Sequence, residues 1–130
     1  MTKLTDDVRS LFDGTNFAHV ATLLPDGSPH SVPMWTAIED DRIVIMTGPD
    51  SRKARNLARD PRVAISIVDE GNMLVSVHVR GRLAEVLDGA EAWTIIDRLA
   101  NKYIGMDYPR EEERVVMFIE PEHAKYIKLG

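Results

Sequence analysis

Several chemistries are excluded by what this sequence lacks. The 130 residues include no cysteine, which excludes disulfide bonds, iron–sulfur clusters, thiolate zinc sites and a cysteine nucleophile. A chain without cysteine also fits the reducing cytoplasm, where we expect it to work. The longest unbroken apolar run, at 115–119, has five residues, so we expect no membrane-spanning segment. The start of the chain carries acidic residues where a signal peptide needs an apolar stretch.

An excess of positive charge is also missing. The sequence has 16 basic and 21 acidic residues and a net charge of −5, which argues against nucleic acid as a partner. Apolar residues make up 44%, which is ordinary for a globular protein. The length fits one domain over residues 1–130, and no repeat or linker divides it.

Familiar catalytic motifs are absent too. The sequence contains no G-x-S-x-G or S-x-x-K serine motif, no G-x-G-x-x-G loop and no Walker A loop. Its four histidines show no ligand spacing, so we expect no metal site. No side chain is therefore assigned a catalytic role.

What is present is a series of short periodic segments separated by glycine and proline. They predict a helix that ends at Gly14, a helix at 52–59, and a helix that Asp88 and Glu91 begin as a capping box. Strands are expected at 17–24, 30–38, 43–47, 63–68, 73–86, 115–119 and 124–129. Gly81 indicates a bend or bulge, and Pro33 an edge strand, a bulge or a position where no ladder donor is needed. Six or seven mostly hairpin-linked strands favour a small antiparallel β-barrel with helices packed outside it.

The strongest functional signal is a basic cluster in this acidic chain. Five of the 16 basic residues lie within 11 positions: Arg52, Lys53, Arg55, Arg59 and Arg62. Cations oppose the helix dipole at a helix start, whereas the free N–H groups there can bind a phosphate. A helical wheel places Arg52, Arg55, Asn56 and Arg59 on one face and Ala54, Leu57 and Ala58 on the opposite face. The cluster is either an anion site capped by Ser51 or Asp50, or a solvated basic face.

A second, weaker signal is the stretch Val32-Pro-Met-Trp35. The tryptophan could offer a flat surface to a planar ring, although a tryptophan in a strand is more often part of the core. An anion-binding helix start, a flat side chain and no catalytic set together suit an enzyme whose cofactor carries the reaction.

These segments resemble a known family. The matching stretches are Phe17-Ala-His-Val-Ala-Thr-Leu, Pro25-Asp-Gly-Ser-Pro, Val32-Pro-Met-Trp, Ser51-Arg-Lys-Ala-Arg-Asn-Leu-Ala-Arg-Asp-Pro-Arg-Val and Val79-Arg-Gly-Arg-Leu-Ala-Glu-Val. They resemble the pyridoxamine 5′-phosphate oxidase-like split β-barrel family. The sequence pattern K-x-R-N-L-x-R-D-P-R at 53–62 looks most like the branch of this family that uses the deazaflavin coenzyme F420. The resemblance implies a split-barrel homodimer with two cofactor sites at the subunit interface.

The resemblance also implies roles for particular residues. Ser51, Lys53 and Asn56 match residues that hold the cofactor phosphate, with Arg52 and Arg55 adjacent. Pro33, Met34 and Trp35 match the strand beside the cofactor ring, and Thr47 the strand end that leads to the phosphate. The C-terminal Tyr126-Ile-Lys-Leu-Gly lacks the R-L-x-P-type segment of true pyridoxamine phosphate oxidases, so vitamin B6 oxidation is not expected.

The predicted function is hydride transfer from reduced coenzyme F420 to a small conjugated acceptor. Two alternatives stay open: an FMN-dependent oxidoreductase of the same fold, and a non-catalytic binding protein for a flavin or deazaflavin. Because the deazaflavin carries an acidic oligoglutamate tail, Arg59 and Arg62 are candidates for its extra cationic surface.

Overall fold

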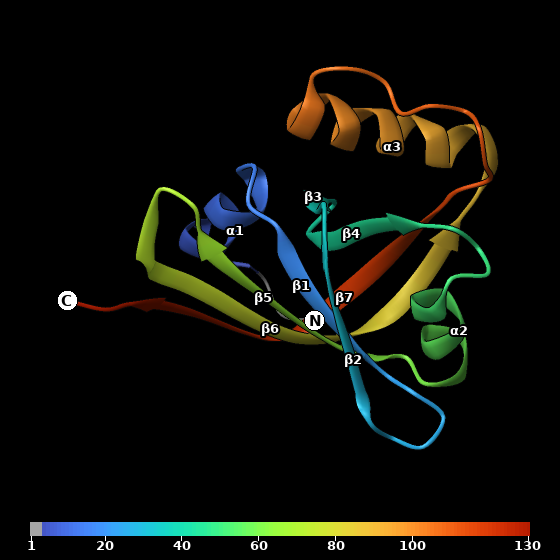
Figure 1. Cartoon of the computed structure of the whole chain (residues 1–130). Helices are drawn as coiled ribbons and strands as arrows, with labels where there is room; N and C mark the ends of the chain where they lie inside the picture. The colour runs from blue at the N-terminus through green and yellow to red at the C-terminus, as the bar shows by residue number, and fades with distance from the viewer. Residues whose placement is uncertain (1–3) are drawn as a thin grey trace.

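The computed structural model describes residues 4–130 as three helices and seven strands (Figure 1). In chain order the elements are α1 (Asp6–Asp13), β1 (Ala18–Leu23), β2 (Pro29–Met34), β3 (Ala37–Glu39), β4 (Arg42–Thr47), α2 (Arg52–Arg59), β5 (Arg62–Asp69), β6 (Asn72–Leu87), α3 (Gly89–Ile104) and β7 (Val115–Lys128). The Thr5 hydroxyl caps α1 by accepting from the Val8 N–H. Gly105 ends α3 with a positive φ of 70°, a conformation that glycine adopts without steric cost. None of these helices over residues 4–130 is long and apolar enough to cross a membrane.

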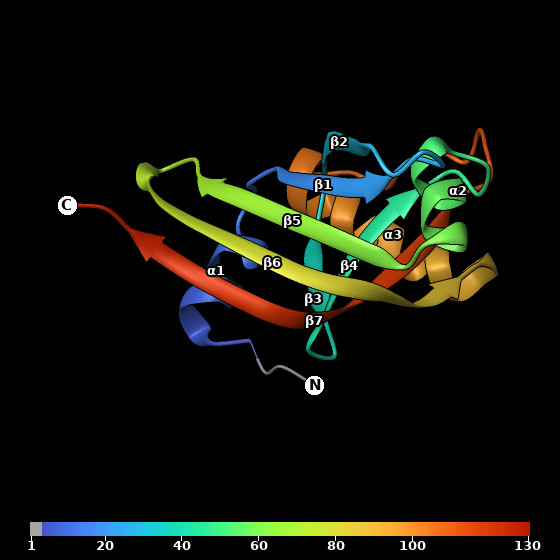
Figure 2. The same ribbon diagram turned by 90° about the horizontal axis from the view of Figure 1, so that it is seen from below.

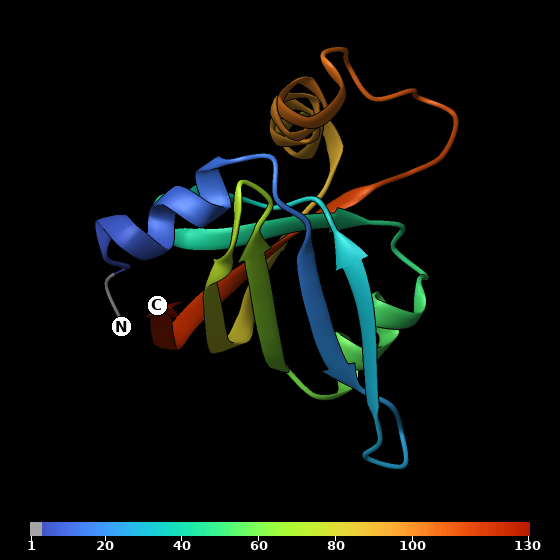
Figure 3. The ribbon, with the colours of Figure 1, turned by 60° about the vertical axis from the view of Figure 1, so that its left-hand side comes forward.

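All seven strands join one antiparallel sheet in the order β2-β1-β5-β6-β7-β4-β3. The sheet curls on itself without closing, with α3 on one side (Figure 3). The predicted antiparallel split barrel with flanking helices is therefore confirmed. Pro33 lies on the edge strand β2, as predicted, where a residue without an N–H is tolerated.

The inner surface of the curled sheet holds the main core. Val8, Leu11 and Phe12 of α1 pack there with strand residues such as Ile45 and Ile65. A second cluster lies on the opposite face of β4 and β7, where the apolar side of α3 covers Val44, Val116 and Phe118. Because residues alternate between the two faces of a strand, β4 and the first part of β7, residues 115–119, are buried on both sides.

The outer face of β1, β5 and β6 is left uncovered by the helices of residues 4–130 (Figure 2). Small and polar side chains point outward from it. The register places His19 opposite Ser66 and Ser66 opposite His78 in one row, and Ala64 opposite Arg80 in the next. All five of these residues are exposed.

Three local predictions are wrong. Residues 30–38 form two strands because the chain turns at Trp35 and Thr36, where the Thr36 N–H bonds the Tyr103 hydroxyl in place of a strand partner. Residues 115–128 form one strand, since a register shift at Gly81 accommodates Pro121. Asp88 makes no side-chain capping bond, so the expected capping box does not form.

Candidate functional site

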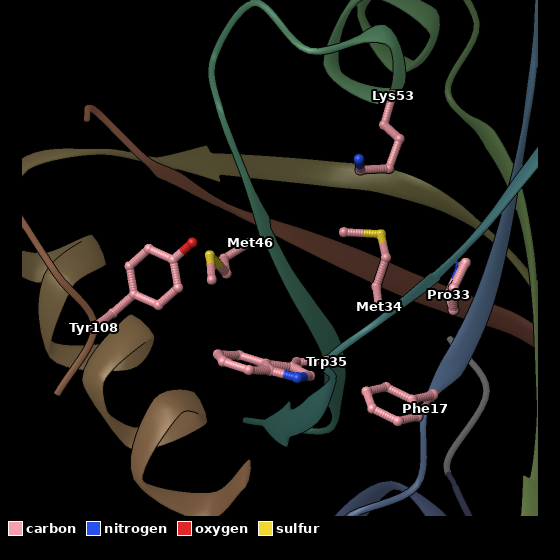
Figure 4. Close-up of a pocket in the computed structure, with 7 residues that line it drawn as sticks. All are labelled: Phe17, Pro33, Met34, Trp35, Met46, Lys53 and Tyr108. Carbon is pink, nitrogen blue, oxygen red and sulfur yellow. The ribbon is translucent and has the colours of Figure 1, made fainter. Parts of the chain in front are cut away.

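An open pocket of about 270 Å³ lies where β2, β4, the start of α2 and the loop after α3 meet (Figure 4). Its lining residues are Phe17, Pro33, Met34, Trp35, Met46, Lys53 and Tyr108. Lys53 enters from α2, across the pocket from the rings of Trp35 and Phe17 (Figure 4). Four of the residues predicted from the sequence are thus brought together: Pro33, Met34, Trp35 and Lys53.

The start of α2 is fastened to the end of β4. The Ser51 hydroxyl oxygen accepts from the Ala54 N–H at 3.1 Å and from the Thr47 hydroxyl at 2.9 Å. With its oxygen engaged twice, the Ser51 hydroxyl still has its own hydrogen to donate. The predicted pair Thr47 and Ser51 therefore stands at the helix start with one donor available for a ligand.

Lys53 brings an unbalanced positive charge to the pocket. It is half-buried and has no acidic partner among residues 4–130. Burial lowers the pKa of Lys53 from its ordinary 10.5, and the nearby Arg114 guanidinium lowers that pKa further. Arg114 also approaches the loop before α2, since a Cβ on Gly48 would lie 3.1 Å from Arg114 Nη1. Arg114 pairs with the exposed Glu112 at 3.3 Å, whereas Lys53 has no such pair among residues 4–130, so this wall is receptive to an anion.

The other predicted residues of α2 take different positions. Arg52 is half-buried, and its Nε is buried without a hydrogen-bond partner in the described part of the chain. Arg55 is exposed. Asn56 is fully buried, where its amide donates to the Thr22 hydroxyl at 3.0 Å and ties α2 to β1. The expected grouping of helix faces is therefore wrong for Asn56, which is buried, and for Ala58, which is exposed. The ligand-binding roles of Arg52, Arg55 and Asn56 stay predictions.

Two further arginines of the basic cluster are partly engaged. Arg59 donates to the Leu23 carbonyl. Arg62 pairs with Asp60 at 2.7 Å, and this hydrogen bond lowers the pKa of Asp60 to about 2. Arg62 is therefore less available to a distant anion than Arg55.

An aromatic wall supports the ring side of the pocket. Trp35 stacks on Tyr103 with ring centroids 5.3 Å apart and planes within 6°. Phe17 stacks on the same tyrosine at 6.0 Å, and Tyr108 meets Trp35 edge-on at 6.0 Å. Phe17 is 55% exposed, an unusual position for a large apolar ring unless something covers it.

The loop that carries Tyr108 is held by α3. Asp97 accepts two hydrogen bonds from Arg110, at 2.6 and 2.7 Å, and one from the Tyr108 N–H at 3.1 Å. The Arg110 bond holds the pKa of Asp97 below its ordinary value. Arg110 also lies 4.2 Å from the centre of the Trp93 ring. Tyr108 is therefore positioned over the pocket although it belongs to an irregular loop.

Five contributors to this site were not predicted from the sequence: Phe17, Met46, Tyr103, Tyr108 and Arg114. Tyr103 falls on the apolar stripe of α3 and looks like a core residue, whereas Tyr108 and Arg114 belong to a loop with no local pattern. Of these five residues, Phe17 alone gave a local signal of a site, because it is an aromatic residue directly before β1.

The pocket combines flat apolar surface with positive charge. Among residues 4–130, its lining includes no carboxylate, histidine or serine, and the titratable side chains there are Lys53 and Tyr108. This arrangement can bind a planar ring that bears an anionic group, whereas the reaction must come from the bound group.

The fold is that of a split-barrel protein, with an open pocket that joins flat apolar surface to a cationic helix start. The family model described as pyridoxamine 5′-phosphate oxidase matches residues 4–128, and the chain belongs to that family. The predicted family resemblance is thereby confirmed. The description of that family is of an oxidase, so the chain belongs to an oxidoreductase-like family.

Solved structures share the fold over nearly the whole chain. An F420 reductase superposes with a TM-score of 0.82 at 24% identity, over 94% of this chain and 98% of that one. A conserved hypothetical protein from Mycobacterium tuberculosis gives 0.79 at 25% identity, over 98% and 90%. General stress protein 26 from Bacillus anthracis gives 0.72 at 18% identity, over 94% and 92%. A search of curated proteins finds no match.

Proposed function

We propose that this protein is a homodimeric oxidoreductase that binds reduced coenzyme F420 and reduces a small conjugated acceptor. The observation that carries the proposal is the joining, in one pocket, of the cationic start of α2 with an aromatic wall. When bound, the reduced deazaflavin would supply a hydride to the acceptor, and solvent would supply the balancing proton. The residues of the chain bind and orient the two compounds.

The residues at the start of α2 fit a phosphate group. Lys53 has no acidic partner in the described residues, Arg52 has an unpartnered buried Nε, and Ser51 has a free hydroxyl hydrogen. The first N–H groups of α2 have no partner within the helix, and the positive end of the helix dipole lies at the same end, so both favour a bound anion. An anion bound here would satisfy the orphaned Arg52 donor and offset the repulsion between Lys53 and Arg114.

The opposite side of the pocket fits a flat ring. Pro33, Met34 and Trp35 line it from β2, and Trp35 is held in its plane by Tyr103. The Tyr108 hydroxyl points toward the pocket near Met46 (Figure 4). From there it can donate a hydrogen bond to an oxygen of the acceptor.

Coenzyme F420 is favoured over FMN by the motif of α2 and by its free charge. The resemblance of Lys53-Ala-Arg-Asn to the deazaflavin branch supports this choice, and an F420 reductase shares the fold. Arg55 is exposed, without an acidic partner in the described chain, and could meet the oligoglutamate tail. FMN remains the alternative, since both compounds carry a phosphate and a tricyclic ring.

A second copy of the chain is part of the proposal. The pocket's volume of about 270 Å³ falls just short of the usual range of about 300–1,000 Å³ for ligand sites. Pro33 lines the pocket and also begins the outward row that continues through His19 and Ser66. A second subunit seated on this uncovered sheet face would border the pocket and complete its wall.

The first test is a binding titration of the purified protein with F420 and with FMN, followed by fluorescence. We expect tighter binding of F420, and Lys53→Ala should weaken it by about 1.5–3 kcal/mol because a charged partner of the phosphate is lost. Lys128→Ala, which removes an exposed lysine at the end of β7, is the matched control and should bind like the wild type. Unchanged affinity in Lys53→Ala would rule out the proposed site.

The second test separates an enzyme from a binding protein. Reduced F420 is mixed with the protein and a panel of conjugated carbonyl and quinone acceptors, and its oxidation is followed by absorbance. Turnover of at least one acceptor supports the oxidoreductase. Tight binding with no oxidation above the uncatalysed rate would favour the non-catalytic alternative.

A further inference from the structure

Two adjacent residues near the end of α3, Lys102 and Tyr103, connect this helix to the segments that carry two of the three aromatic residues of the pocket, Phe17 and Trp35. Lys102 Nζ donates to the Phe12 carbonyl at 2.7 Å and to the Thr36 carbonyl at 2.5 Å. The Tyr103 hydroxyl donates to the Asn16 carbonyl at 2.6 Å and accepts from the Thr36 N–H at 3.1 Å. Lys102 and Tyr103 thus make four hydrogen bonds to backbone groups outside α3.

The bonds to Asn16 and Thr36 reach the backbone directly beside two pocket rings, whereas the bond to Phe12 reaches α1. Asn16 precedes Phe17, and Thr36 follows Trp35. The ring of Tyr103 lies against both, at 6.0 Å from Phe17 and 5.3 Å from Trp35. The pairing of β1 with β2 ends at Ala18 and Met34. Phe17 and Trp35 lie one residue beyond it, where the bonds and ring contacts of α3 connect them.

We propose that Lys102 and Tyr103 are positioning residues that hold Phe17 and Trp35 at the spacing a planar ring requires. This inference rests on the proposed function, because it assumes that the pocket binds such a ring. Neither side chain lines the pocket itself. Both act through the residues that do.

The charge on Lys102 controls the strength of this connection. Burial lowers the pKa of Lys102 to about 8, against a smaller opposite effect of Asp13 at the end of α1. Glu39 of β3 and Arg98 of α3 line a hollow beside Lys102, and Glu39 accepts a hydrogen bond from Arg98. The centre of the Tyr103 ring lies 4.8 Å from Lys102 Nζ. Loss of the proton converts two charge-assisted bonds into ordinary ones, which are roughly half as strong. The backbone at Thr36, and with it Trp35, should therefore loosen as the pH rises.

The test uses the ligand-free protein first. Trp93→Phe leaves Trp35 as the single tryptophan, whose emission is recorded from about pH 7 to about pH 9.5, between the ordinary pKa values of histidine and tyrosine. We expect a transition near pH 8 that is absent from Lys102→Met and from Lys102→Arg, which stays charged. Lys53→Met controls for the other lysine with a lowered pKa, and it should retain the transition. A transition that persists in Lys102→Met would overturn the inference.

Binding of FMN and of F420 is then compared among the same variants. Lys102→Met and Tyr103→Phe, which keeps the ring but loses both hydroxyl bonds, should each weaken binding by about tenfold, while Lys128→Met should not. Wild-type affinity in both variants would refute the positioning role. A wild-type protein that binds neither compound would refute the proposed function instead, and the emission titration would still show whether Lys102 controls Trp35.

Discussion

At the scale of single residues, the site depends on a lysine that the fold leaves without an acid. The sequence placed Lys53 and Arg55 in the same basic cluster, but they are two positions apart on α2. That spacing is roughly half a helical turn, which puts the two side chains on different sides of the helix. Lys53 faces the pocket beside Arg114, whereas Arg55 faces solvent. Burial and the second cation lower the pKa of Lys53, which means that both disfavour its charged form. A bound anion would stabilise that charged form.

This lowered pKa predicts how binding depends on pH. The affinity for F420 or FMN should fall as the pH rises through the pKa of Lys53, and the fall should begin earlier than for an ordinary lysine. The phosphate of FMN keeps its charge throughout, since its second pKa is about 6. Titrations between about pH 7 and about pH 10 measure this. Lys53→Arg stays charged, so the share of the fall that belongs to Lys53 should vanish in it; an identical pH profile would contradict the assignment.

The sequence could predict only the local part of the site. Ser51 and Lys53 follow from helix-capping rules and from charge spacing, which act within one turn. Tyr108 reaches the pocket, and Tyr103 and Arg114 reach the residues that line it, through long-range packing of α3 and its loop, which no local pattern encodes. Asn56 was misplaced because a polar side chain can pair inside the core, here with Thr22.

At the scale of elements, the long strands β6 and β7 depend on one glycine. Gly81 is buried at the register shift between these strands, and a Cβ there would lie 2.3 Å from the Glu120 carbonyl oxygen. That neighbour is backbone and cannot swing away. The sequence identified this bulge because an isolated glycine within a strand pattern is its usual mark.

We predict that Gly81→Ala lowers the free energy of unfolding by at least about 1–3 kcal/mol, the usual cost of overpacking. Urea denaturation followed by circular dichroism measures this. Gly71→Ala is the matched control, because a Cβ there meets Asp69 at an ordinary 3.5 Å and should change little. Equal stability of the two variants would show that the strands shift to accept the methyl group.

Most helices and strands were also predictable from the sequence, and the wrong strand boundaries share one cause. Periodicity located every helix and most strands, since one buried face imposes a repeat on the sequence. The break at Thr36 and the unbroken β7 were missed because both depend on partners far away in the chain, Tyr103 for one and Gly81 for the other.

At the scale of the whole molecule, the uncovered face of β1, β5 and β6 is where we predict that two copies meet. Ala64→Glu would place a carboxylate in the middle of this face, repeated across the two-fold axis of a dimer. We expect a dimeric wild type and a monomeric variant in analytical ultracentrifugation, with weaker F420 binding by the variant. Ala90→Glu on the exposed start of α3 should stay dimeric. A monomeric wild type, or an Ala64→Glu dimer, would contradict this arrangement.

The edge position of β2 has a consequence for solubility. This strand lines the pocket, so it must stay accessible to a ligand, and an accessible strand edge can recruit strands from other molecules. Pro29 and Pro33 remove two N–H donors from its six residues. A strand from another molecule would therefore form fewer hydrogen bonds with β2. The rim of the pocket can then remain open in a crowded solution without starting aggregation.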